Sequence, residues 1–160
     1  SEMCIRDRNK GYSAQEIYDY LMNNKMNATI YVTVDTLEYL KKGGRLSPAA
    51  ATLAGLLKIK PILTIQGEKL DKYGTSRTMK KARKMMIDQV KQDISDRGWV
   101  DDYEVACVYS YDKEAALDYL EQVKEAFPDK EVIFDRLSLS VACHIGPGSL
   151  AVAAYKKGSY

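Results

Sequence analysis

The sequence has little that could hold a metal ion. Its 160 residues include a single histidine, His144, and three cysteines, at positions 4, 107 and 143, that form no CxxC pair. Zinc sites in proteins usually require four Cys or His ligands at characteristic spacings. We therefore expect no metal centre and interpret the cysteines as reduced thiols.

Long apolar runs and a strong charge of one sign are missing as well. No apolar stretch approaches the 18 or so residues that suggest a membrane span, and the N-terminus lacks the apolar core of a secretory signal. The 24 basic and 22 acidic side chains leave a net charge of +2, whereas nucleic-acid binders usually carry a larger basic excess. These absences predict a cytoplasmic protein with no stable membrane insertion and no nucleic-acid partner.

The residues that are present indicate a folded domain. Hydrophobic side chains make up 46% of the sequence and charged ones 29%, which is typical of globular proteins. A chain of this length forms one domain or part of a larger one, and buries about two thirds of its unfolded surface. Residues 1–8 have neither strand alternation nor a helical stripe. We interpret residues 1–10 as a foreign or disordered leader and residues 11–160 as the domain.

Capping residues and apolar spacing predict alternating helices and strands. Ser13 and Glu16 form a capping box, and Ser47-Pro48 is a typical helix start. Helices are expected over 13–24, 37–42, 47–57, 78–94, 116–127 and 149–155. Strands are expected over 29–35, 62–66, 70–75, 104–110 and 131–134, with a further extended piece over 137–143. Residues 62–75 favour a hairpin, and the other strands require crossovers. This pattern predicts an α/β domain with a mixed sheet, and leaves an α+β arrangement open.

The loop Gly43-Gly44-Arg45-Leu46-Ser47 carries the first candidate site. Arg45 directly precedes a predicted helix start, where the helix dipole disfavours positive charge. This placement becomes favourable if Arg45, Ser47 and the free backbone N–H groups hold an anion together. The alternative is a turn between two helices with a solvated arginine.

The loop His144-Ile-Gly-Pro-Gly-Ser carries the second candidate site. We expect His144 at a strand end, where α/β folds gather their sites, and its imidazole could donate a hydrogen bond to a carboxylate. The alternative is a partly buried histidine beside a glycine turn that only starts a helix. The loop lacks the Gly-Lys-Ser/Thr ending of a P-loop, and no GxSxG motif accompanies the histidine for serine-based acyl transfer.

A basic run begins the predicted helix 78–94. It consists of Arg77, Lys80, Lys81, Arg83 and Lys84. Such a run could bind nucleic acid or a phosphate, but its members occupy the outward positions of an amphipathic helix, and acidic residues follow on the same helix. The pattern favours a solvated face.

Four segments together resemble a known family. They are Val34-Asp-Thr-Leu-Glu-Tyr-Leu-Lys-Lys-Gly-Gly-Arg-Leu-Ser47, Leu56-Leu-Lys-Ile-Lys-Pro-Ile-Leu63, Arg77-Thr-Met-Lys-Lys-Ala82 and His144-Ile-Gly-Pro-Gly-Ser149. In this order they resemble the C-terminal half of DegV family proteins, the bacterial fatty-acid-binding proteins. The resemblance covers roughly residues 11–160. Nothing in residues 1–28 corresponds to the family's N-terminal domain, so we expect a truncated chain.

The resemblance implies a carrier without catalytic residues, metal or cofactor other than its lipid ligand. Such a carrier buries one long-chain fatty acid and presents its carboxylate to a separate ATP-dependent fatty-acid kinase, which forms an acyl phosphate for phospholipid synthesis. His144, with Gly146 and Gly148, is expected at the head group. Arg45, with Gly43 and Gly44, is expected to serve the kinase, and Ser47 and Arg77 are candidate anion contacts. Residues 49–57 and the predicted helix after Gly148 are candidate tunnel walls.

A protein of a different class remains as the alternative. A small α/β regulatory or protein-interaction domain could sense a phosphate-type anion through Arg45 and the basic helix. A fatty acid that co-purifies with the chain would favour the carrier, whereas a ligand-free mass with stabilisation by anions would favour the regulatory domain.

Overall fold

Residues 7–53, 58–66 and 69–157 are described by a computed structural model, which forms one mixed sheet with helices on both faces. The strands are β1 (Ala28–Thr33), β2 (Lys60–Gln66), β3 (Lys69–Ser76), β4 (Tyr103–Tyr109), β5 (Val132–Arg136) and β6 (Leu150–Lys156). The helices are α2 (Ala14–Asn24), α3 (Glu38–Lys42), α4 (Pro48–Ala51), α5 (Met79–Asp96), α6 (Lys113–Ala126) and α7 (Leu139–Ile145). Residues 1–6, most of the predicted leader, lie outside the described part.

The six strands run in the order β3-β2-β1-β6-β4-β5. β4 and β5 are parallel and joined through α6, whereas every other neighbouring pair is antiparallel. The expected α/β fold with a mixed sheet is therefore confirmed. β6, the last strand in the chain, lies in the middle of the sheet between β1 and β4.

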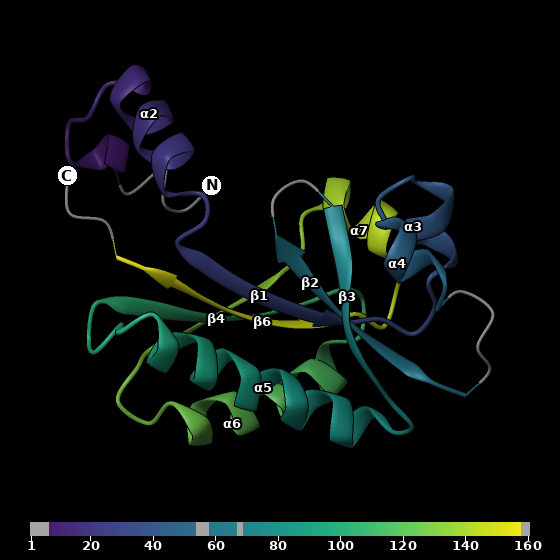
Figure 1. The fold of residues 1–160 in the computed structure, drawn as a ribbon. Helices are drawn as coiled ribbons and strands as arrows, with labels where there is room; N and C mark the ends of the chain where they lie inside the picture. Colours follow the sequence, from purple (N-terminus) through teal and green to yellow (C-terminus); the bar gives the residue numbers. More distant parts are fainter. Residues whose placement is uncertain (1–6, 54–57, 67–68, 158–160) are drawn as a thin grey trace.

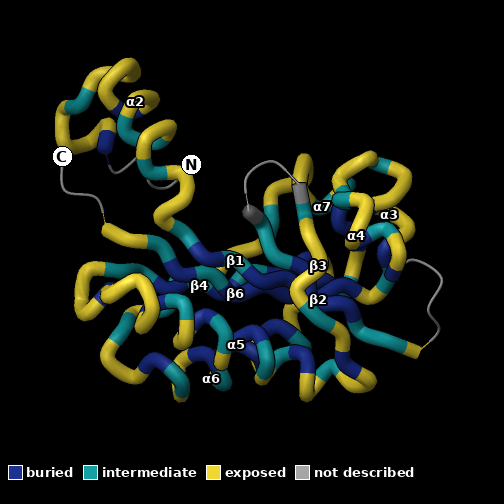
Figure 2. The backbone as a smooth tube through the Cα atoms, in the orientation of Figure 1, coloured by how far each residue is buried: buried dark blue, intermediate teal, exposed yellow. Residues whose placement is uncertain are grey.

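Two apolar cores lie on opposite faces of this sheet. In Figure 1, α5 and α6 lie side by side under the sheet, while α3, α4 and α7 gather over one end of its upper face, and α2 stands apart at the other end. The core under the sheet includes Met86, Val90, Val105, Tyr119 and Val123, each fully buried. The core over the sheet, here called the α3–α7 core, consists of Val32, Val34, Leu37, Leu40, Ala50, Leu53, Leu63, Ile145 and Ala151. The buried strands in Figure 2 separate the two cores.

Two predicted helix caps are confirmed: Ser13 and Glu16 form the capping box at α2, and Ser47 caps α4. Thr78 caps α5, which is not predicted from the sequence. The predicted hairpin is formed by β2 and β3. The predicted helix over 47–57 is α-helical at residues 48–51, and residues 54–57, like the turn at 67–68, lie outside the described part.

Two predictions near the C-terminus are wrong. The expected extended piece over 137–143 is largely the helix α7, so His144 lies in the last turn of a helix and not at a strand end. The expected helix over 149–155 is the central strand β6. A strand covered on both faces has a nearly continuous apolar sequence, which periodicity cannot distinguish from a buried helix. Pairing with β1 and β4 overrides the high helix propensity of its alanines.

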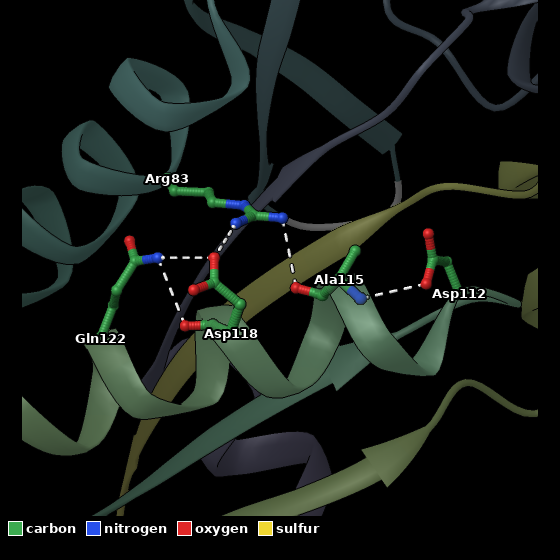
Figure 3. A network of polar contacts seen from close by, with 5 residues as sticks. All are labelled: Arg83, Asp112, Ala115, Asp118 and Gln122. Atoms are coloured by element: carbon green, nitrogen blue, oxygen red, sulfur yellow. Dashed lines mark hydrogen bonds and ion pairs between the residues drawn. The ribbon is translucent and has the colours of Figure 1, made fainter.

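The solvated-face interpretation of the basic run holds for Arg77, Lys80, Lys81 and Lys84, which are exposed. It is wrong for Arg83, whose side chain is 13% exposed and forms an ion pair with Asp118 of α6 at 2.7 Å. Figure 3 shows its guanidinium bridging α5 to α6, with Nη2 donating to the Ala115 carbonyl at 3.2 Å. The same guanidinium lies 5.7 Å from the centre of the Tyr119 ring. Arg83 therefore stabilises the helical layer under the sheet.

The two described cysteines should differ sharply in reactivity. Cys107 is fully buried in β4, and burial raises the pKa of its thiol to about 12, which leaves about one thiolate in 10⁴ at pH 8. Cys143 on α7 is exposed. In a Cys4→Ser background, we expect iodoacetamide to alkylate Cys143 rapidly and Cys107 only after denaturation, as measured by peptide mass spectrometry. Equal labelling of both thiols in the native protein would contradict this burial.

Candidate ligand-binding site

The ends of three adjacent strands bring the two predicted loops together. Thr33 at the end of β1 pairs with Leu150 at the start of β6, and Leu150 pairs on its other side with Tyr109 at the end of β4. The segment after β1, which contains Gly43 and Arg45, therefore leaves the sheet beside the loop 146–149. α3 and α7 also contact each other directly.

Buried serines anchor the loop 146–149 to the end of β4. The Ser110 hydroxyl donates to the Gly146 carbonyl at 2.6 Å and accepts a hydrogen bond from the Ser149 amide at 3.0 Å. The Ser110 amide in turn donates to the Ser149 carbonyl at 3.0 Å. Both serines are buried. Their hydrogen bonds fix the loop, and with it the end of α7 that carries His144.

His144 lies against the glycines that follow α3. A Cβ atom added at Gly43 would lie 2.9 Å from Nδ1 of the His144 ring, so any side chain at position 43 would displace the imidazole. The histidine is half-buried. None of the described residues forms a hydrogen bond with either ring nitrogen.

The other two glycines expected at the head group are also close-contact positions. Gly146 has a φ of +81°, and a Cβ there would lie 2.5 Å from Cδ2 of Tyr39. Gly148 has a φ of +74°, and a Cβ there would lie 2.1 Å from Oδ2 of Asp35. Asp35 is held by Lys60, whose Nζ lies 2.8 Å from Oδ1. Both positions require glycine, since the backbone is left-handed and space is lacking.

We expect Gly148→Ala to destabilise the protein more than Gly44→Ala does. Both glycines have a positive φ, but a Cβ at Gly44 would meet no atom within 4 Å, whereas one at Gly148 collides with Asp35. The shared backbone strain costs about 1 kcal/mol, and the collision should add about 1 kcal/mol more in the free energy of unfolding. Urea denaturation measures the difference. If the collision is its cause, Asp35→Ala in the Gly148→Ala protein should remove it; equal losses for the two glycine variants would contradict the close approach.

Arg45 is exposed, and its backbone is held on both sides. Its amide donates to the Leu40 carbonyl at 3.0 Å, and its carbonyl accepts a hydrogen bond from the Leu70 amide at 3.1 Å. The guanidinium folds back and donates from Nη1 to the Gly43 carbonyl at 3.0 Å. Arg45 therefore contacts the carbonyl of Gly43. His144 lies next to the position that a Cβ atom of this glycine would occupy.

The two candidate anion contacts are placed differently. The Ser47 hydroxyl already caps α4 through the Ala50 amide and donates to Asp71; this bond, with one from the Lys72 amide, lowers the pKa of Asp71. Arg77 follows the last residue of β3. The Arg45 loop lies at the opposite end of this strand, where Leu46 pairs with Leu70. Six residues of strand span about 20 Å. The structure does not bring Arg77 to the Arg45 loop.

Sequence reasoning missed the residues that support this site. Ser110 bonds the loop 146–149, Tyr39 and Asp35 lie against its glycines, and Lys60 pairs with Asp35; the sequence assigns none of the four a role in a site. From the sequence, Asp35 is placed only at the end of an expected strand, with no role in a site.

An apolar strip of the sheet adjoins the α3–α7 core. Val32, Ala151 and Val108 form one row across β1, β6 and β4, and belong to or pack against that core. Because side chains alternate along a strand, the next row on the same face is Ile30, Ala153, Ala106 and Ile133. These four residues, here called the apolar floor, are half-buried. Among the residues that the structure describes, no helix packs over this middle part of the upper face (Figure 1).

In the described part of the chain, no helix is both long and apolar enough to cross a bilayer. The described residues also contain no group of three or more His, Cys, Asp or Glu side chains suited to a metal ion.

Fold and site define the class as an α/β domain with a polar loop junction next to an apolar sheet face. The chain belongs to the DegV family: the model of that family, described as an uncharacterised protein family, matches residues 4–157. The resemblance inferred from the four sequence segments is thus confirmed.

Individual relatives agree with this assignment. A DegV domain-containing protein of Clostridium perfringens is 33% identical over 144 residues, which cover 89% of this chain and 48% of that protein. The structure of a fatty-acid-binding DegV family protein from Streptococcus agalactiae has a TM-score of 0.77 and 28% identity, over 98% of this chain and 53% of that one. A stearic-acid-binding protein from Eubacterium ventriosum has a TM-score of 0.81 at 24% identity, over 98% and 54% of the two chains, and shares the fold. The chain spans about half the length of these relatives.

Proposed function

We propose that this chain binds a long-chain fatty acid and presents its carboxylate to an ATP-dependent kinase. The observation that carries the proposal is the meeting of His144 with the Gly43–Arg45 loop beside the apolar floor. The fatty-acid binding stated for the Streptococcus agalactiae relative supports the ligand class. Pockets for such ligands are mostly apolar, with a few polar groups that fix orientation.

The head group is assigned to the junction of the two loops. A ring nitrogen of His144 would donate a hydrogen bond to the carboxylate. Glycines at positions 43, 146 and 148 leave the space around it free of side chains. A Cβ atom at these positions would collide with His144, Tyr39 and Asp35, respectively. Beyond this junction the carboxylate would need no further charge from the chain, since a hydrogen bond to a charged group is among the stronger ones.

The acyl chain is assigned to the apolar floor and the adjoining α3–α7 core. From Ala28, the first residue of β1, to Val34, the residue after it, the chain spans about 20 Å at the usual rise per residue, long enough for an extended acyl chain. Each buried CH₂ group contributes about 0.8 kcal/mol, so affinity comes from the chain and orientation from the head group. Of the predicted tunnel walls, Ala50 and Leu53 belong to the core, residues 54–57 lie outside the described part, and the segment after Gly148 contributes as β6.

The kinase step requires an accessible carboxylate. A carboxylate oxygen attacks the γ-phosphorus of ATP, the new O–P bond replaces the bond to ADP, and ADP leaves. All catalytic groups are assigned to the kinase, and Arg45 to the contact between the two proteins. An exposed arginine next to the head group can neutralise phosphate charge during transfer.

Native mass spectrometry of the purified chain tests the ligand directly. We expect a bound mass that matches a fatty acid and disappears after organic extraction, and rebinding of oleate. Ala153→Phe places a ring on the apolar floor and should weaken oleate binding roughly five-fold, or about 1 kcal/mol. Ala126→Phe, on a half-buried alanine of α6 under the sheet, is the control and should leave binding unchanged.

The alternative function has its own signature in the same experiment. A ligand-free mass, no rebinding of oleate and a melting temperature raised by phosphate would indicate an anion-sensing domain. Equal effects of the two phenylalanine variants would remove the acyl chain from the apolar floor.

A further inference from the structure

Beyond the apolar floor, the next row on the same face of the sheet contains two polar side chains. The row consists of Ala28, Tyr155 and Glu104, which pair across β1, β6 and β4. Ala154 and Val105, the neighbours of Tyr155 and Glu104 along their strands, belong to the core under the sheet. Because side chains alternate along a strand, Tyr155 and Glu104 point to the upper face, as the apolar floor does.

Tyr155 and Glu104 form a polar pair at the end of the apolar floor. The Tyr155 hydroxyl donates a hydrogen bond to Oε2 of Glu104, and both residues are half-buried. Past this pair the chain is exposed, as at Asp102 and Lys157. The apolar surface of the upper face is therefore bounded by polar groups at both ends, by the loop junction with His144 at one end and by the Glu104 carboxylate at the other.

The distance between these two ends corresponds to a fatty acid of defined length. The strand from Val34 to Ala28 spans about 20 Å. Successive carbons of an extended acyl chain advance about 1.25 Å, which is the projection of a C–C bond of about 1.5 Å. About 16 bonds therefore fill this distance, as in a fatty acid of about 16 to 18 carbons.

We propose that Glu104 limits the length of the fatty acid that this chain binds. This inference rests on the proposed function and defines the ligand class of the same site. A methyl end that advanced over the polar pair would remove the Glu104 carboxylate from water without offering it a hydrogen bond, and such burial of a charged group is costly. Tyr155 holds the carboxylate in place through its hydroxyl. Carbons beyond this point therefore add no affinity.

Oleate and gadoleate test the proposal, because both have a cis double bond at the same position and gadoleate is longer by two CH₂ groups at the methyl end. On a longer apolar surface these groups would tighten binding about four-fold each, or about fifteen-fold together. We expect wild type to bind the two acids with affinities within two-fold of each other. We expect Glu104→Leu to bind gadoleate at least five-fold more tightly than oleate. Displacement of the fluorescent fatty acid cis-parinarate measures both affinities.

Glu125→Leu is the matched control, since Glu125 is an exposed glutamate of α6 under the sheet, and it should keep the wild-type ratio of the two affinities. In Glu104→Leu the Tyr155 hydroxyl loses the Glu104 acceptor. Glu104→Leu combined with Tyr155→Phe is therefore the second variant, and it should also favour gadoleate at least five-fold.

Other outcomes separate this proposal from the proposed function. A wild-type ratio in both Glu104 variants, or an equal rise in Glu125→Leu, would overturn the length limit while leaving fatty-acid binding intact. Wild type that itself favours gadoleate five-fold or more would do the same. If wild type binds neither acid, the proposed function fails, and the length limit fails with it.

Discussion

Arg45→Ala should lower kinase-dependent acyl phosphate formation at least ten-fold and leave fatty-acid affinity within a factor of a few. Arg45 is exposed, and its guanidinium reaches only the Gly43 carbonyl among the described residues, whereas the acyl chain is assigned to the apolar floor on the sheet. The arginine is thus placed to contact the kinase and the transferring phosphoryl group. A ten-fold change corresponds to about 1.4 kcal/mol in the barrier.

The rate should fall through kcat at saturating carrier. Arg45→Lys should restore little, because an ammonium cannot make the two parallel hydrogen bonds of a guanidinium. Arg77→Ala is the matched control, since Arg77 is an exposed arginine at the far end of β3. Equal losses of lipid binding and phosphorylation would place Arg45 at the head group, and full activity of Arg45→Ala would make it a solvated loop residue.

Local signals explain the elements that the sequence predicted well. The capping residues Ser13, Ser47 and Thr78 accept hydrogen bonds from amides within three residues of themselves. A short stretch of sequence is therefore enough to predict such a cap. The amphipathic pattern of α5 likewise requires only the helix itself. By contrast, β6 is a strand because β1 and β4 pair with it on both sides. Its own alanine-rich sequence favours a helix. The two strands that pair with it are distant in the sequence, so no local pattern could have predicted a strand here.

The same distinction applies to the site. The two glycine-containing loops are candidates from their sequences alone, but the close approach of Gly43 and His144 joins residues from different parts of the chain. The Arg83 ion pair with Asp118 also depends on how α5 and α6 pack. The positive φ of Tyr111, +70°, could not be predicted either, because tyrosine has no preference for this region. Ser110 on one side is bonded to the loop 146–149, and Asp112 on the other caps α6.

The role of His144 at the head group predicts a change in affinity. Loss of a hydrogen bond to a charged group costs about 1 to 3 kcal/mol, so His144→Ala should weaken oleate binding about 5- to 150-fold. The histidine is half-buried at the end of α7, and its removal should change the melting temperature little. Isothermal titration calorimetry with oleate measures the effect, and His144→Gln should recover part of it because the amide can also donate.

Gly43→Ala supplies an independent test of the same position. Its Cβ would lie 2.9 Å from Nδ1 of His144, so it should displace the imidazole without removing any polar group from the chain. We expect a loss of oleate affinity in the same direction as for His144→Ala, and little further loss when the two substitutions are combined, since both remove one hydrogen bond. Additive losses would mean that Gly43 acts on the ligand separately. An unchanged affinity in His144→Ala would remove the histidine from the head-group site, and the carboxylate would then have to be held by other residues.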